Sequence, residues 1–205
     1  MFSTYGFVAF FSYILGGALA DKYSPRRLLS YSLILTSLGG VFMMTYPSYY
    51  SMQFLFAYWG FTTVYLFWAP MIKATSIIGG LYKQGQTFSF LDAGRGIVAS
   101  SIGIIGVLIF SFVVVGDISA STIQEKQNAF RYVIGVSSFI VFMTGVYVFI
   151  SLNIEVKNDA RIGNLRDMKK LIKSKSIILI GLIILTAYMG YKITDIYSLY
   201  ASEIM

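Results

Sequence analysis

The chain contains no cysteine and no histidine, and only 12% of its 205 residues are charged. The missing cysteines exclude disulfides and thiolate metal sites. The missing histidines remove the commonest general base and the commonest metal ligand. No phosphate-binding glycine loop is present, and of the hydrolytic arrangements only a serine–lysine pair could be built. We therefore expect no enzyme activity, no cofactor and no metal site.

Long apolar segments occupy most of the chain instead, and 57% of the residues are hydrophobic. A helix needs about 20 mostly apolar residues to cross a bilayer. Six segments qualify: 2–20, 28–46, 52–72, 88–115, 129–152 and 176–201. None shows the alternating pattern of a β-barrel strand. The prediction is an all-α, polytopic transmembrane helix bundle with six transmembrane helices.

Lysine and arginine are concentrated in every second connection between these segments, and this sets the orientation. The basic residues of the first, third and fifth connections are Lys22, Arg26, Arg27, Lys73, Lys83, Lys157, Arg161, Arg166, Lys169, Lys170, Lys173 and Lys175. The second connection has none, and the fourth has only Lys126. Since cytoplasmic loops carry an excess of Lys and Arg, the odd connections are predicted to be cytoplasmic. The basic residues behind the net charge of +7 therefore indicate a lipid bilayer as the partner and not a nucleic acid.

The first connection carries the motif G-A-L-A-D-K-Y-S-P-R-R at residues 17–27. It resembles the loop between the second and third helices of major facilitator superfamily transporters, whose pattern reads G-x-L-a-D-r-x-G-r-r. The matching positions are Gly17, Leu19, Asp21, Lys22 and Arg26. Ser24 and Pro25 stand where the family prefers glycine and arginine.

The resemblance implies a partial major facilitator fold in which the six segments are helices two to seven. Residues 1–152 would be the N-terminal transmembrane half, with helices two to six and without the first helix. Residues 153–175 would be the cytoplasmic linker that joins the family's two halves. Residues 176–205 would be the first helix of the C-terminal half. We expect the chain to be a truncation, because its first helix would otherwise enter from outside.

The resemblance also implies that the first connection locks and releases the two halves during alternating access. The carboxylate of Asp21 can accept backbone N–H groups at a helix N-terminus. Arg26 and Arg27 can pair with Asp21 or with lipid headgroups, or they can act only as orientation signals. Gly17, Asp21, Arg26 and Arg27 are predicted gating residues.

A second gating pair is predicted at Asp92 and Arg95, which are three residues apart and can pair on a helix. A charge inside a membrane helix is costly unless it is paired or wet. Arg95 is therefore interpreted as a clamp to Asp21 or Asp92, with solute contact as the alternative. Small residues nearby, at Gly94, Gly96, Gly103 and Gly106 among others, are interpreted as faces for close helix packing.

The candidate solute site lies in the last segment, where Tyr188, Lys192 and Asp195 share one helix face. Two opposite charges in an apolar run indicate a functional site, and the resemblance makes this segment the cavity-lining helix seven. Lys192 would attract an anion, and Asp195 would orient it or carry a proton. The alternative is that Lys192 snorkels to the outer interface.

Two further solute-binding candidates, Tyr65 and Lys73, lie in the third segment. Tyr65 follows Tyr58 and Thr62 at near-helical spacing. A stripe of hydroxyls should face protein or water, because lipid offers no hydrogen-bond partner. Lys73 lies further toward the cytoplasm.

The favoured function is a secondary carrier that moves a small solute by alternating access. Its cavity cations favour an anionic solute, and protons or Na⁺ are the candidate coupling ions. The expected location is the cell membrane, of the bacterial inner type. The alternatives are a non-transporting membrane scaffold or assembly module, and an inactive transporter fragment.

Overall fold

The computed structural model describes residues 1–114, 122–154, 174–183 and 186, which fall within two compact units, Met1–Asp159 and Ala160–Met205. The first unit contains α1 (Phe2–Lys22), α2 (Pro25–Met43), α3 (Tyr49–Gly60), the π-helical segment η1 (Phe61–Trp68), α4 (Ala69–Gly79), α5 (Gln84–Val113) and α6 (Ile123–Ser151). In the second unit, residues 175–183 are helical. The described residues contain helices and no strand, which confirms the predicted all-α class.

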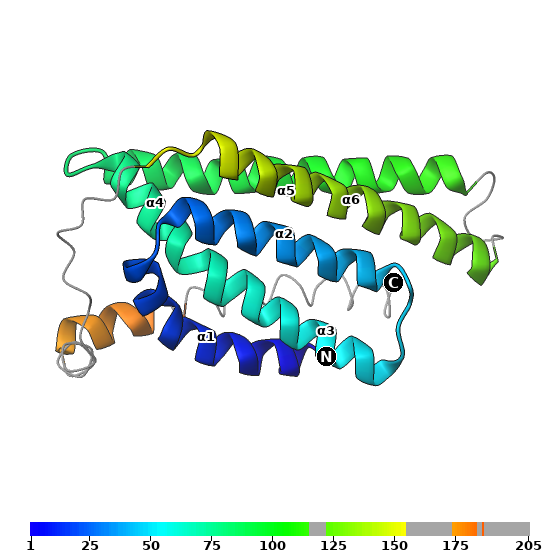
Figure 1. Ribbon diagram of the computed structural model, residues 1–205, viewed down its shortest axis with the longest axis horizontal. Coiled ribbons are helices and arrows are strands. Elements are labelled where there is room, and N and C mark those ends of the chain that lie inside the picture. Colours follow the sequence, from blue (N-terminus) through cyan, green and yellow to red (C-terminus); the bar gives the residue numbers. More distant parts are fainter. Residues whose placement is uncertain (115–121, 155–173, 184–185, 187–205) are drawn as a thin grey trace. The chain divides into compact units, whose positions relative to one another are not determined.

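Helix α2 lies in the middle of the first unit (Figure 1). It packs against α6 on one side and against α3, η1 and α4 on the other. Helix α1 packs against α3, η1 and α4, and α5 packs against α4 and α6. The turns between α1 and α2 and between α4 and α5 lie at one end of the unit, and the α2–α3 turn lies at the other (Figure 1). The first and third connections, which are both basic, therefore share one end, as the predicted orientation requires.

Four helical runs are long and apolar enough to cross a membrane: Phe2–Lys22, Tyr49–Gly79, Gln84–Val113 and Ile123–Ser151. The second of these is α3, η1 and α4 in continuous succession. Several predicted bounds were too short because helices continue past the apolar segment. The run at 52–72 extends to Tyr49–Gly79, and α6 begins six residues before the predicted start at 129. Thr122 explains this early start, because its hydroxyl accepts from the Glu125 N–H at 3.3 Å while the Glu125 carboxylate accepts from the Thr122 N–H at 2.8 Å.

Helix α2 is less apolar than these four, and its buried face includes three serines beside leucines and glycines. Ser30, Ser32 and Ser37 are all buried. The Ser30 hydroxyl donates to the Gly145 carbonyl of α6 at 2.8 Å, and the Ser32 hydroxyl donates to the Thr62 carbonyl of η1 at 2.7 Å. Large hydrophobic side chains instead cover the outside of the unit. This distribution suits a lipid environment, where helices associate through close packing and interhelical hydrogen bonds.

The π-helical segment η1 interrupts the run Tyr49–Gly79, which was predicted as one uninterrupted segment at 52–72. Pro70, just after it, has no N–H and its ring crowds the carbonyl four residues earlier. Side-chain hydroxyls also compete for the backbone. The Trp59 carbonyl accepts from the Thr63 hydroxyl at 2.6 Å, and the Thr62 carbonyl accepts from Ser32. These competing bonds favour a wider turn, in which the helical face shifts relative to an α-helix.

Candidate functional site

The end of α1 is held by a lysine from a distant part of the chain. The Lys73 ammonium donates to the carbonyl of Ala20 at 2.6 Å and approaches that of Asp21 at 3.4 Å. These carbonyls belong to the last turn of α1, which ends at Lys22, and they lack partners within the helix. A cation at this end also complements the helix dipole. In this structure the Lys73 ammonium caps α1, and its predicted role in solute binding stays a prediction.

Two predicted gating residues on α1, Gly17 and Asp21, lie on its exposed side. Within the described part of the chain the Asp21 carboxylate has no ion pair and no hydrogen bond. The neighbour Gly16, which sequence reasoning passed over, makes the close contact. A Cβ built on Gly16 would lie 3.3 Å from the Tyr65 carbonyl, whereas one on Gly17 meets nothing within 4 Å. Gly16 therefore lets α1 approach η1, while Gly17 and Asp21 remain open to a further partner.

The two arginines of the first connection differ in their surroundings. Arg26 donates from Nε to the Phe149 carbonyl at 2.6 Å, and its guanidinium lies 5.1 Å from the centre of the Phe149 ring. Phe149 is in the last turn of α6, so Arg26 joins the start of α2 to the end of α6. Arg27 is exposed and contacts no charged or hydrogen-bonding partner among the described residues. Pairing of either arginine with Asp21, one of the possibilities left open by the sequence, does not occur within the described part of the chain.

The predicted pair on α5 is formed, with Arg95 3.1 Å from the Asp92 carboxylate. Both side chains are more than half exposed, so this ion pair contributes little stability. The interhelical contact of Arg95 is to an aromatic ring and not to Asp21. Its guanidinium lies 5.0 Å from the centre of the Trp68 ring, at the end of η1. Of the glycines near this pair, Gly94, Gly96 and Gly103 have open space where a side chain would be, and only Gly106 lies against α6.

The hydroxyl groups that were predicted to share one face of the third segment have different surroundings before and within the π-helical turn. Tyr58 donates to the Leu35 carbonyl of α2 at 2.7 Å, and fully buried Thr62 accepts from Thr36 of α2 at 3.1 Å. These hydroxyls face protein, as predicted. Tyr65 is half-buried, its ring stacks on Phe61 at 5.0 Å, and its hydroxyl makes no hydrogen bond to any described residue. The single face predicted from α-helical spacing is therefore wrong, because η1 has more residues per turn than an α-helix.

The strongest solute-site candidates, Tyr188, Lys192 and Asp195, lie outside the described residues. The linker at 153–175 also lies almost entirely outside them. Their predicted roles stay predictions.

A clamp at the opposite end of the unit was not predicted. Arg131 of α6 donates to the Met44 carbonyl at 3.1 Å, and its guanidinium lies 5.5 Å from the centre of the Tyr46 ring. Tyr46 in turn donates its hydroxyl to the Gln127 carbonyl of α6 at 2.6 Å. Tyr46 has a φ of +50°, which is uncommon for a residue other than glycine. The sequence signal was Arg131 itself, which lies about two turns inside α6.

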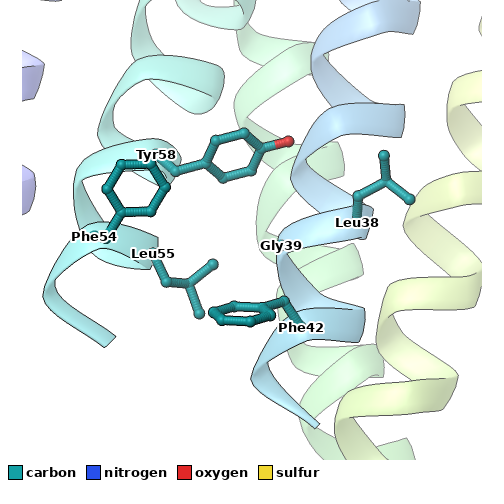
Figure 2. Close-up of a pocket in the computed structure, with 6 residues that line it drawn as sticks. All are labelled: Leu38, Gly39, Phe42, Phe54, Leu55 and Tyr58. Carbon is teal, nitrogen blue, oxygen red and sulfur yellow. The ribbon is translucent and has the colours of Figure 1, made fainter. Parts of the chain in front are cut away.

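An apolar pocket of about 250 Å³ opens between α2 and α3 near the same end. It is lined by Leu38, Gly39 and Phe42 of α2 and by Phe54, Leu55 and Tyr58 of α3, and Figure 2 shows Phe42, Leu55 and Tyr58 between the two helices. Its one polar group, the Tyr58 hydroxyl, is already bonded to Leu35. The pocket therefore offers an apolar surface and no free polar side-chain group that could bind a polar ligand.

Comparison with known proteins identifies the chain's relatives. The family model described as the Major Facilitator Superfamily matches residues 1–204. The chain is 30% identical over 196 residues to the inner membrane protein YihN of Escherichia coli K12, covering 92% of this chain and 44% of that protein. It is 27% identical over 201 residues to the inner membrane protein YqcE of the same organism, covering 97% of this chain and 44% of that one. The chain thus spans less than half the length of these relatives. No solved structure matches it.

Proposed function

The chain belongs to the major facilitator superfamily, a family of membrane transporters, and from this we propose that it is part of a secondary carrier of the inner membrane. The carrier moves a small anionic solute by alternating access, driven by a proton or Na⁺ gradient. The single observation that carries the proposal is the family match across nearly the whole chain, residues 1–204.

Solute binding is assigned to Tyr65, Tyr188, Lys192 and Asp195. Support for Tyr65 comes from its half-buried ring and its unbonded hydroxyl among the described side chains. Support for the other three is their common helix face and their charges within an apolar segment. Lys192 supplies the positive charge for an anion, and Asp195 is the coupling group.

Gating is assigned to the cytoplasmic end of α1. The Asp21 carboxylate is exposed, and no described residue pairs with it, so it is available to a helix N-terminus in the remainder of the transporter. Lys73 and Arg26 hold the ends of α1 and α6 in place through carbonyl contacts. Because these contacts hold the end of α1 rigidly, we expect Asp21 to move together with the rest of the bundle.

Uptake by cells that express the complete gene, against a panel of sugar acids and phosphorylated sugars, tests the proposal. Asp195→Asn should abolish gradient-driven accumulation of the solute and preserve exchange of internal for external solute, because only the proton-carrying step is lost. Asp159→Asn in the charged segment at 153–175 serves as the control and should transport normally. Unchanged accumulation by Asp195→Asn would remove Asp195 from the mechanism. Absence of uptake for every solute on the panel would count against the assigned solute class.

A further inference from the structure

The turn between α4 and α5 carries the two most exposed large hydrophobic side chains of the described residues. Tyr82 is 96% exposed and Leu81 is 88% exposed. The turn consists of residues 80–83 and lies at the same end of the first unit as the basic turn between α1 and α2 (Figure 1). Adjacent apolar side chains displayed in this way indicate an interaction surface.

Backbone hydrogen bonds fix the conformation of this turn. Gly80 ends α4 with a φ of +56°, a conformation that favours glycine, and its N–H donates to the Ser76 carbonyl at 3.1 Å. The Lys83 N–H donates to the Gly79 carbonyl at 3.1 Å. Because these bonds close the turn on both sides, its backbone holds the two apolar side chains away from the bundle.

The membrane run that leads to the turn is long enough to bring it to the headgroup layer. Tyr49–Gly79 has 31 residues, which corresponds to about 46 Å at the rise of an α-helix. A bilayer with its two headgroup layers is about 40–45 Å thick. A span that begins among the headgroups of one leaflet therefore ends among those of the other, and the turn lies at that level.

The chemistry of the turn suits this layer. Tyrosine is enriched at membrane interfaces, where its ring meets the acyl chains and its hydroxyl meets the headgroups. Lys83, the next residue, is exposed, and its ammonium makes no ion pair and no hydrogen bond with any described residue. A lysine at this level is attracted to the anionic lipids of the cytoplasmic leaflet.

Charge favours lipid over another part of this chain as the partner of the turn. The segment 153–175 is predicted to lie on the same side of the membrane. It contains seven basic and three acidic residues, which is a net charge of +4. This segment would repel Lys83, whereas a lipid phosphate would attract it.

We propose that Leu81, Tyr82 and Lys83, named here the α4–α5 anchor, bind the cytoplasmic surface of the bilayer. Leu81 and Tyr82 enter the boundary between headgroups and acyl chains, and Lys83 binds the phosphate of an anionic phospholipid. The anchor sets the depth of this end of α4 and α5 in the membrane. It uses none of the residues assigned to solute binding or gating, so it does not depend on which solute is carried.

A cysteine at Leu81 labelled with the fluorophore bimane tests the proposal, since the chain has no cysteine of its own. The protein is reconstituted into liposomes of phosphatidylcholine and phosphatidylglycerol, with bromine on the acyl chains of one lipid at a time. Brominated lipid should quench the label strongly, and a neutral water-soluble quencher should quench it weakly. Quenching should show a preference of about fivefold for phosphatidylglycerol, the effect expected of one lysine at an anionic surface.

Three variants separate the role of Lys83 from general effects of charge. Lys83→Gln should abolish the preference for phosphatidylglycerol, and Lys83→Arg should keep it. Lys126→Gln removes an equal charge near the start of α6, at the opposite end of the unit, and should leave the preference unchanged.

Each other outcome would overturn the proposal. Strong quenching from water without quenching by lipid would place the turn outside the bilayer. Protection from both quenchers would show that protein covers it. No preference for phosphatidylglycerol in the parent, or one that survives Lys83→Gln, would show that Lys83 does not bind an anionic headgroup.

Discussion

At the scale of single residues, three positive charges of the described part of the chain are used on backbone carbonyls. Lys73, Arg26 and Arg131 each donate to a carbonyl of another segment. Within the described residues the single ion pair is the exposed one between Asp92 and Arg95. Because carbonyls at helix ends have no partner within the helix, a cation satisfies a bond that would otherwise be lost. These contacts fix where helices end relative to one another.

Replacing Lys73 by methionine should loosen the end of α1. Hydrogen bonds from charged groups contribute about 1.5–3 kcal/mol, and 1.4 kcal/mol corresponds to a tenfold change in an opening equilibrium. A cysteine placed at Ala20, which is 3% exposed, should therefore react with a maleimide roughly tenfold faster in Lys73→Met than in the parent. The chain has no cysteine of its own, so labelling has no background.

Lys73→Arg is the matched control for this experiment, because it keeps a cationic donor. It should label close to the parental rate. Equal rates for Lys73→Met and the parent would mean that the carbonyl contacts do not hold α1.

Gly40 is the second residue where a small change should have a large effect. A Cβ at this position would lie 2.0 Å from the Ser138 hydroxyl and 3.1 Å from its Cβ. Gly40→Ala should lower the free energy of unfolding by about 1–3 kcal/mol, the usual cost of overpacking. Unfolding in a mixed detergent series measures this quantity.

Gly17→Ala provides the comparison, since a Cβ on Gly17 meets nothing within 4 Å. It should be neutral or slightly stabilising, because alanine is a better helix former than glycine by about 1 kcal/mol. If the two variants unfold alike, the tight α2–α6 contact is not important for stability.

At the scale of elements, α2 and α6 form the most tightly joined pair. Arg26 ties the start of α2 to the end of α6, and Arg131 with Tyr46 ties the other ends together. Between them, Ser30 bonds to the Gly145 carbonyl. Contacts at both ends and in the middle prevent sliding and rotation, so the pair is expected to move as one body.

Arg26→Gln should therefore lower the melting temperature of the protein in detergent by several degrees, because the Phe149 carbonyl loses a charged donor and the ring loses its cation. Arg27→Gln removes an equal charge from the adjacent, exposed position and should have little effect. A similar loss in both variants would point to a general effect of charge and not to the contact with α6.

The described helices could be located from the sequence because each carries an apolar segment of membrane length. The sequence did not predict which helices pack against one another. The start of α6 was misjudged because the capping pair Thr122 and Glu125 is polar and lies outside the apolar run. The π-helical turn was missed because it depends on Pro70 together with hydroxyls that meet the backbone only after folding. The carbonyls and rings that Lys73, Arg26 and Arg95 contact come from distant helices and leave no local pattern in the sequence.

At the scale of the whole molecule, the described helices alternate in direction and collect their basic turns at one end of the first unit (Figure 1). This agrees with the family and with a multi-pass membrane protein. The chain covers 44% of each relative's length.

The orientation can be checked with single cysteines in intact cells. Cysteine at Ser48, in the turn before α3, should react with a membrane-impermeant maleimide added outside. Cysteine at Tyr82, which is 96% exposed in the turn before α5, should react only after the membrane is permeabilised. Labelling of Lys169 or Lys170 by amine reagents in sealed cells would contradict the predicted cytoplasmic linker.

The serine-rich face of α2 has a consequence for how this protein is made. A segment enters the membrane readily when it is apolar enough by itself, and α2 falls short of the four helices that are. Its Ser30 hydroxyl finds its acceptor 115 residues further along the chain. We therefore expect α2 to enter the membrane less readily by itself than those four helices, and its hydrogen bond to α6 to form only after α6 has been synthesised.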